Sequence, residues 1–246
     1  TTGRPKGVIV SHGNIVNTMR ACQLLHECSP SDVGLVLAAS TFDVFYFELF
    51  IAMLAGGQSR IVTQEEIFSP QKIDELLKTA TIFQAVPGLM ENLLTSMSQS
   101  SSHSHESLRV VITGGDIVPA DLLATLSHAF PKARVFVAYG PTEATIFSTL
   151  YLYDRQRPVN GYPIGQPLDG VEVFIADEHG NALPDDVTGE IWIGGRGVAT
   201  GYIHRDAETR ASFIELNGRK YYRSGDRGCW NRVQQTFEFR GRLDSQ

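Results

Sequence analysis

The chain has 246 residues, of which 42% are hydrophobic and 20% are charged, and its formal net charge is −6. This composition suits a globular protein of one large domain or two smaller ones, and the negative charge argues against a nucleic-acid binder that depends on basic patches. No apolar run in the sequence is long enough to span a membrane. The three cysteines, Cys22, Cys28 and Cys229, lack the spacing of a metal site, so we expect free thiols and a reducing, cytoplasmic compartment.

The first 155 residues alternate between strand-like and helix-like stretches. Ser11 is a candidate cap for the first helix, and Pro70 and Pro87 stand where later helices begin. Strands are expected at residues 7–10, 33–38, 59–63, 81–86, 108–113 and 134–138, and helices at 12–28, 42–54, 70–78, 87–97 and 119–130. This alternation predicts an α/β fold, a mainly parallel sheet with flanking helices and right-handed crossovers.

Two polar stretches interrupt this pattern. Residues 99–106 (QSSSHSHE) are predicted to form a surface loop, in which His103 and His105 have no neighbouring partners at metal-ligand spacing. Proline-rich sequence near residue 155 precedes expected strands at 171–176, 190–194 and 236–240 and a short helix at 207–213. We therefore expect an α/β subdomain at residues 1–155 and a smaller β-rich subdomain, a distorted barrel, at residues 156–246.

The end of the strand at 134–138 carries polar chemistry. It is followed by Tyr139, a Gly-Pro turn, Thr142 and Glu143, with a helix-capable stretch beyond. Ligands of open α/β sheets bind at the carboxyl ends of strands. The ring can stack on a base, the hydroxyl can bond phosphate, and the carboxylate can hold a magnesium ion that bridges phosphate oxygens.

Other segments, taken one at a time, are weaker evidence for a function. Residues 1–7 (TTGRPKG) combine hydroxyls, glycines and Lys6 in a loop that could wrap polyphosphate, although Lys6-Gly7 leads into a strand and the loop is not a Walker A motif. Asp226 follows a Ser-Gly pair, expected as a tight turn, and could either accept bonds from a ribose diol or be an aspartate in a turn. Residues 189–202 form a glycine-rich β segment without a reactive side chain, and residues 241–244 look turn-like.

Taken together and in order, six motifs are specific. They are TTGRPKG (1–7), FDVFYFE (42–48), AYGPTE (138–143), GEIWIGGRGVATGY (189–202), YYRSGD (221–226) and GRLDSQ (241–246). With them the chain resembles the adenylate-forming superfamily, most closely the amino-acid adenylation domains of nonribosomal peptide synthetases. The resemblance implies that ATP and an amino acid form an aminoacyl-adenylate and pyrophosphate. It also implies transfer to the phosphopantetheine arm of a carrier domain, with carrier and condensation domains as partners.

The resemblance implies roles for residues of five of the six motifs. Tyr139 would stack on adenine, Asp226 would bind ribose, and Thr142 and Glu143 would be the catalytic pair, with Glu143 holding Mg²⁺. Asp244 would be the hinge of a C-terminal domain. The implied ATP contacts are Thr1, Thr2, Gly3, Lys6, Gly114, Gly115, Asp116, Tyr139, Thr142, Asp226, Phe239 and Arg242. No nucleophilic side chain is needed, because positioning and charge neutralisation carry such a reaction.

The substrate side follows from the same resemblance. Asp43 would pair with the α-ammonium of an amino acid, and it could also cap the helix at 42–54. The side-chain pocket would consist of Val44, Phe47, Gln84, Ile112, Gly114, Ala138, Ile146 and Phe147. This set offers no charge to a substrate side chain. It favours glycine or another small neutral amino acid, and a larger apolar one next.

Three departures from the family pattern qualify the expectation. Val137 stands where most such domains have asparagine, so an adenine-edge contact is lost or replaced. The chain begins within the phosphate loop, and the C-terminal domain with its lysine is missing, so we expect a central piece of a longer protein and a poor catalyst alone. The alternatives are an acyl- or aryl-CoA ligase of the same superfamily, which Asp43 argues against, and a degenerate, noncatalytic binding module.

Overall fold

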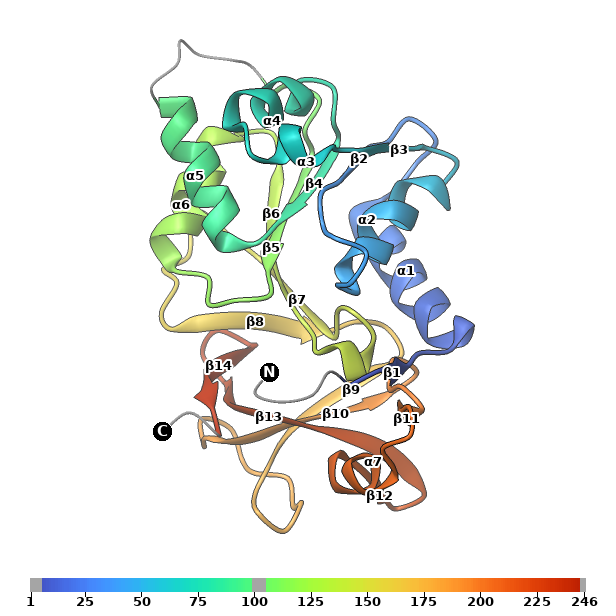
Figure 1. The fold of residues 1–246 in the computed structure, drawn as a ribbon. Coiled ribbons are helices and arrows are strands. Elements are labelled where there is room, and N and C mark those ends of the chain that lie inside the picture. Colours follow the sequence, from blue (N-terminus) through green and yellow to red (C-terminus); the bar gives the residue numbers. More distant parts are fainter. Residues whose placement is uncertain (1–5, 99–104, 244–246) are drawn as a thin grey trace. The chain divides into compact units, whose positions relative to one another are not determined.

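The computed structural model describes residues 6–98 and 105–243, and it contains two compact units (Figure 1). The parallel unit comprises residues 22–138 and 151–162, and the antiparallel unit comprises residues 1–21, 139–150 and 163–246. Both units are discontinuous in sequence, so the expected subdomain boundary near residue 155 stays a prediction. Among the described residues, no helix has the length and apolar character needed to cross a membrane.

The parallel unit contains the expected sheet with helices on both faces. Its parallel strands run in the order β3 (Gln58–Ile61), β2 (Val33–Val36), β4 (Ile82–Ala85), β5 (Val110–Gly114) and β6 (Arg134–Tyr139). The connecting helices are α2 (Val44–Met53), α3 (Gln64–Ile67), α4 (Pro70–Leu77), α5 (Pro87–Ser98) and α6 (Ala120–Ala129). Helices α4, α5 and α6 lie on one face and α2 on the other (Figure 1). The predicted α/β class is confirmed.

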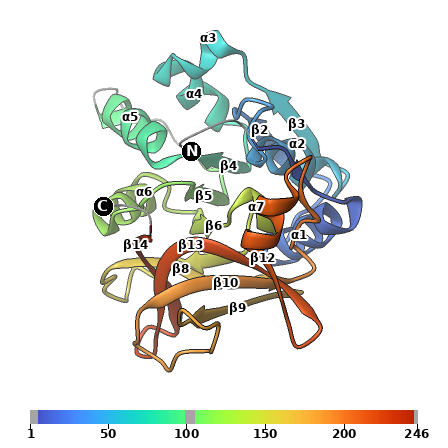
Figure 2. The same cartoon turned by 60° about the horizontal axis from the view of Figure 1, so that its bottom comes forward.

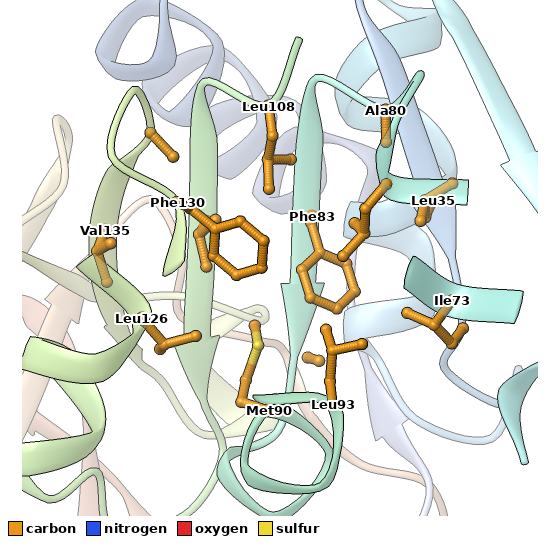
Figure 3. Close-up of a cluster of buried hydrophobic side chains, with 14 of the residues drawn as sticks. Leu35, Ile73, Ala80, Phe83, Met90, Leu93, Leu108, Leu126, Phe130 and Val135 are labelled. Carbon is orange, nitrogen blue, oxygen red and sulfur yellow. The ribbon is translucent and has the colours of Figure 1, made fainter. Parts of the chain in front are cut away.

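The core of this unit lies between the sheet and helices α4 to α6 (Figure 3). Phe83, Met90 and Phe130 are at most 1% exposed and fill its centre. Alternate residues of a strand point to opposite faces, so Val135 and Val137 of β6 join this core while Ala138 points to the other face. Val137, at the position where an asparagine was expected, is therefore a core residue.

Local sequence signals explain the helix starts. The Ser11 hydroxyl accepts a hydrogen bond from Asn14 N at 3.2 Å, at the start of α1 (His12–His26). At α4, Ser69 accepts from Lys72 N, with proline in the first turn. Helix α3 was not expected from the sequence. It is one turn long and begins with a capping box between Thr63 and Glu66.

The end of the polar stretch at 99–106 differs from the expected surface loop. Residues 99–104 lie outside the described residues, but His105 is only 7% exposed. Its Nε2 lies 2.8 Å from Asp74 Oδ1, and its ring meets Phe130 edge-on at 5.3 Å. The end of a polar run is thus buried, because a carboxylate 31 positions away pairs with one nitrogen of the imidazole, while Nδ1 has no hydrogen-bond partner among the described residues.

The antiparallel unit is β-rich. Its sheet order is β7 (Thr149–Leu152), β8 (Tyr162–Pro167), β14 (Thr236–Arg242), β13 (Arg219–Asn231), β10 (Gly189–Gly195) and β9 (Val171–Ala176), with β12 (Phe213–Leu216) on β13. Figure 2 shows β13, β10 and β9 side by side. A separate pair joins β1 (Val8–Ile9) to β11 (Gly201–Tyr202), and α7 (Asp206–Ser212) follows. Among the described residues this sheet is open, so the expected barrel is wrong in that detail.

The Ser-Gly pair before Asp226 is not a turn between elements, as the sequence suggested. It lies inside the 13-residue strand β13. The register of β13 against β14 shifts between Asp226 and Gly228, and Gly225 has a φ of +70°. The segment is therefore a β-bulge, which inserts an extra residue and redirects the side chains beside it.

Candidate functional site

The segment after β6 forms a tight closed loop. Ser148 N donates to Tyr139 O at 2.8 Å and closes it. A Cβ on Gly140 would lie 2.4 Å from Ile146 O and 2.7 Å from Phe147 Cα, so only glycine fits at that position. The loop therefore depends on the glycine of its Gly-Pro pair.

The expected helix after Glu143 is only a 3₁₀ turn, Thr142–Ala144. It ends because Thr145 and Ile146 adopt φ angles of 64° and 70°, which are rare for β-branched residues. Thr145 Oγ1 donates to Gly197 O at 2.6 Å, and Thr18 Oγ1 donates to Thr145 O at 3.1 Å. Such strain persists only when surrounding contacts hold it, and it concentrates at functional sites.

Tyr139 and Asp226, 87 positions apart, meet at this loop. The Tyr139 hydroxyl donates to Asp226 Oδ2 at 2.7 Å, and Arg242 Nη1 donates to Asp226 Oδ1 at 3.0 Å. Burial, together with the neighbouring carboxylate, raises the pKa of Tyr139 well above its usual value, so the phenol keeps the proton that it donates. One carboxylate is thus oriented by an aromatic hydroxyl and a guanidinium.

The bulge of β13 fixes the backbone of Asp226. Asp226 N donates to Ser224 Oγ at 3.0 Å, and that hydroxyl donates to Ile191 O at 2.7 Å in β10. Across the ladder, Asp226 is opposite Arg242, and Gly228 is opposite the half-buried Phe239. A carboxylate held this way can accept two hydrogen bonds from a vicinal diol.

Glu143 is held by a residue of the glycine-rich β segment at 189–202, to which the sequence assigned no chemical role. The Tyr202 hydroxyl donates to Glu143 Oε1 at 2.5 Å. Lys6 Nζ lies 5.1 Å from the centre of the same tyrosine ring. Thr142, next to Glu143, is exposed. The antiparallel unit therefore contains four groups of the expected ATP site or next to it: Lys6, Thr142, Glu143 and Tyr202.

A half-buried carboxylate suits a magnesium ion, which typically takes one or two protein carboxylates together with substrate phosphates and water. Glu143 has one oxygen engaged by a neutral donor, and it lies in the same unit as Lys6. Among residues 6–98 and 105–243, no group of three or more His, Cys, Asp or Glu side chains forms a metal cluster. The residues present fit a phosphate-bridging cation.

In the parallel unit, several candidate pocket residues share one face of the sheet. Gln84 of β4 is opposite Ile112 of β5, and Gly114 is opposite Ala138 of β6. All four positions alternate with core positions along their strands, so they lie on the face of the sheet that carries α2. A Cβ on Gly114 would lie 2.0 Å from Ala138 O, so this glycine is also required for strand packing.

Helix α2 contributes the other candidates of this unit. Phe47 is 0% exposed, and Val44 is the first residue of the helix. Asp43 occupies the N-cap position, but its side chain makes no capping hydrogen bond, so the expected capping role is wrong. A buried acid that sequence reasoning missed, Glu48, accepts hydrogen bonds from Leu37 N and Ala38 N, each at 2.7 Å.

The end of β5 and the turn after it carry three of the expected ATP contacts, Gly114, Gly115 and Asp116. Gly115 has a φ of +82°, which favours glycine, and Asp116 Oδ1 accepts from Ile117 N at 2.7 Å. Asp116 is exposed. Ile146 and Phe147, by contrast, belong to the antiparallel unit, where they are 4% and 5% exposed. Thr1, Thr2, Gly3 and Asp244 lie outside the described residues.

Comparison with known proteins gives this arrangement a family. Residues 1–203 match the sequence model of the AMP-binding enzyme family. Curated relatives include the anguibactin system regulator of Vibrio anguillarum, 33% identical over all of this chain and 24% of its own length. Another is bacitracin synthase 2 of Bacillus licheniformis, 34% identical over all of this chain and 9% of its own length. The chain thus spans a quarter or less of these relatives.

Solved structures agree with the fold. The nonribosomal peptide synthetase FmoA3 matches with a TM-score of 0.91 and 27% identity, over 98% of this chain and 26% of that one. The Vibrio cholerae adenylation domain AlmE, in complex with glycyl-adenosine-5'-phosphate, matches with a TM-score of 0.89 and 25% identity, over 100% of this chain and 47% of that one. The chain belongs to the AMP-binding enzyme family. Its resemblance to the adenylation domains of nonribosomal peptide synthetases, inferred from six motifs, is confirmed.

Proposed function

We propose that this chain activates an amino acid with ATP, forming an aminoacyl-adenylate and releasing pyrophosphate. The observation that carries the proposal is the Asp226 carboxylate, which lies between the Tyr139 hydroxyl and the Arg242 guanidinium. All three residues belong to the antiparallel unit, and the chain is a member of the AMP-binding enzyme family. This arrangement joins three of the expected nucleotide contacts, although Asp226 is 87 positions from Tyr139 in the sequence.

ATP recognition is divided among the expected contacts. The Tyr139 ring stacks on adenine and Asp226 accepts from the ribose hydroxyls, with Arg242 and Phe239 beside it. The family resemblance also assigns Gly114, Gly115 and Asp116 of the parallel unit to ATP. Thr142, Lys6 and the loop of Thr1, Thr2 and Gly3 would donate to the phosphates, and Glu143 would hold Mg²⁺. When bound, the ion neutralises phosphate charge.

The chemistry requires no protein nucleophile. An oxygen of the substrate carboxylate attacks the α-phosphorus, a new P–O bond forms, and the bond to the pyrophosphate oxygen breaks. Two anions must approach each other, so the contribution of the chain is positioning and charge neutralisation. Thr142 and Lys6 supply donors to the phosphates, and the strained loop at Thr145 fixes where Thr142 and Glu143 lie.

The proposed substrate is an amino acid with a small neutral side chain. Asp43 pairs with its α-ammonium, and the family resemblance assigns to its side chain the residues Val44, Phe47, Gln84, Ile112, Gly114 and Ala138 of the parallel unit and Ile146 and Phe147 of the antiparallel unit. The proposal is supported by the absence of a charge in this set and by the likeness to AlmE, whose structure contains glycyl-adenosine-5'-phosphate. A larger apolar amino acid is the second candidate.

The proposed destination of the acyl group is the phosphopantetheine thiol of a carrier domain. Relatives such as bacitracin synthase 2 and gramicidin S synthase 2 are much longer than this chain, which spans 9% and 6% of them. Their names and lengths support a setting with carrier and condensation domains as partners. An acyl- or aryl-CoA ligase remains the rival, and Asp43 argues against it.

ATP–pyrophosphate exchange in the full-length protein tests this function. We expect exchange that depends on an amino acid, strongest with glycine or another small neutral one. Asp43→Ala should abolish it, because the substrate ammonium would lose its counter-charge. Exchange with fatty or aryl acids but with no amino acid would refute the proposed substrate class, and undiminished exchange by Asp43→Ala would refute the ammonium anchor.

A further inference from the structure

We propose that Tyr202 is a positioning residue with two contacts in the ATP site. Its hydroxyl orients the Glu143 carboxylate for a cation, and its ring holds the Lys6 ammonium of the phosphate loop. The inference rests on the proposed function, because it assigns a task within the same ATP site. Tyr202 lies in the glycine-rich β segment, to which the family resemblance gave no role beyond scaffold. Its hydroxyl and its ring each contact one of the two groups.

The hydroxyl fixes the carboxylate. The 2.5 Å bond from Tyr202 to Glu143 Oε1 joins residues 59 positions apart. A tyrosine hydroxyl donates this bond without bringing a positive charge to the carboxylate. Glu143 is also held through its backbone, because Ala199 N donates to Glu143 O at 2.9 Å. The carboxylate therefore has one oxygen oriented by a donor that adds no positive charge to compete with a cation.

The ring fixes the lysine. Lys6 Nζ lies 5.1 Å from the centre of the Tyr202 ring, within the range of a cation–π contact. The backbones agree with this contact, since Val8 of β1 pairs with Tyr202 of β11. Ile203 N donates to Gly7 O and Thr200 N donates to Ile9 O, each at 2.8 Å. The strand that leaves the phosphate loop is thus joined to the strand that carries the tyrosine.

The tyrosine itself is rigidly supported. It is 5% exposed and its ring meets Phe213 at 5.5 Å. Tyr202 N donates to Thr209 Oγ1 of α7 at 3.0 Å. A Cβ on the preceding Gly201 would lie 2.6 Å from Thr209 Cγ2, so glycine is needed for this close approach. Because these contacts hold the Tyr202 ring and backbone in place, the hydroxyl and the ring can hold the groups that they contact in fixed positions.

The two contacts predict a specific dependence on magnesium. Without the hydroxyl, the Glu143 carboxylate loses the hydrogen bond from Tyr202 that orients Oε1, and the cation must order that oxygen on binding. Loss of this hydrogen bond to a charged group should weaken binding of the linked cation by about tenfold, which corresponds to about 1.4 kcal/mol. Recognition of the nucleoside by Tyr139 and Asp226 does not involve Tyr202 and should be unaffected.

Titration calorimetry on the full-length protein tests the proposal with the Tyr202→Phe variant, which keeps the ring. ATP is titrated at a series of MgCl₂ concentrations, and adenosine is titrated without metal. We expect the MgCl₂ concentration for half-maximal ATP binding to rise about tenfold, with adenosine affinity within twofold of wild type. Tyr221→Phe is the matched control, because its hydroxyl donates to Glu172 Oε2 at 2.9 Å instead, and it should change neither value.

A second variant, Tyr202→Leu, removes the ring as well. It should weaken metal-free ATP binding in addition, because Lys6 loses its support. If that variant fails to fold, Tyr202→Phe alone decides. A magnesium midpoint within twofold of wild type, or an equal loss of adenosine and ATP affinity, would overturn the inference. Failure of the wild-type protein itself to bind ATP would instead refute the proposed function, and this inference with it.

Discussion

At the scale of single residues, the site is built from carboxylates whose partners fix their direction. Asp226 is oriented by Tyr139 and Arg242, and Glu143 by Tyr202. Each of the two carboxylates has at least one neutral phenol as its donor. A phenol orients a carboxylate without neutralising it, so the negative charge stays available for a ribose diol or a cation.

Glu48 is a third buried carboxyl, and it predicts a pH dependence of stability. Burial raises its pKa to about 7, although hydrogen bonds from Ala38 N and Leu37 N act in the opposite direction. The folded state therefore holds a proton that the unfolded state loses from about pH 4.5 upward, and this contribution to stability disappears as the pH rises to about 7.

The prediction is tested by urea denaturation of the wild type and Glu48→Gln between these two pH values. Glutamine does not titrate, so the wild type should lose stability relative to the variant as the pH increases, by up to about 3 kcal/mol. Asp121→Asn, at a carboxylate in the first turn of α6, serves as the control. A difference between wild type and Glu48→Gln that stays constant, or that grows with pH, would contradict the assignment.

At the scale of elements, the close contact between strands β5 and β6 is itself a reason for glycine at position 114, in addition to any ligand. Gly114 is opposite Ala138, and its hypothetical Cβ would lie 2.0 Å from the Ala138 carbonyl oxygen. Any side chain there must separate β5 from β6. The position therefore serves the sheet as well as the proposed pocket.

Gly114→Ala should destabilise the protein by more than about 2 kcal/mol, because the backbone of a buried strand pair cannot yield cheaply. Gly88→Ala in α5 is the matched control, since nothing lies within 4 Å of its added Cβ. That change should be neutral or stabilising by about 0.5–1 kcal/mol. Thermal denaturation of both variants measures the difference, and equal melting temperatures would show that the strands separate without cost.

Periodicity and capping signals predicted the parallel unit well. Strands β2 to β6 and helices α2, α4, α5 and α6 lie within a few residues of their expected positions. Features decided by distant partners were not predictable in this way. The bulge at Gly225 depends on pairing with β14, and the burial of His105 depends on Asp74. Strands β7, β8 and β12 are short or carry proline or glycine, and their sequences gave no clear signal.

The candidate site shows the same division. Resemblance identified Tyr139, Asp226 and Arg242, and the structure brings these three together. Tyr202 and Glu48 were missed, because a tyrosine in a glycine-rich strand and an acid in an apolar helix look like scaffold without their partners. In Glu48 the signal was present, since an acid within FDVFYFELF is costly to bury unless hydrogen bonds satisfy it.

At the scale of the whole chain, each compact unit combines segments that are separated in the sequence. Of the described residues, the antiparallel unit combines residues 6–21 with residues 139–150 and 163–243. This grouping explains why Lys6, Glu143 and Tyr202, from three distant motifs, occur in one unit. The family match over residues 1–203 includes all three.

The central claim is that the protein adenylates an amino acid in preference to other carboxylic acids. The most direct measurement is mass spectrometry of the adenylates that the full-length protein forms from ATP and Mg²⁺ in an equimolar mixture of amino, fatty and aryl acids. The account predicts one dominant aminoacyl-adenylate, with a small neutral side chain, accompanied by an equal amount of pyrophosphate. A dominant fatty-acyl or aryl adenylate, or no adenylate from a protein that binds ATP, would contradict it.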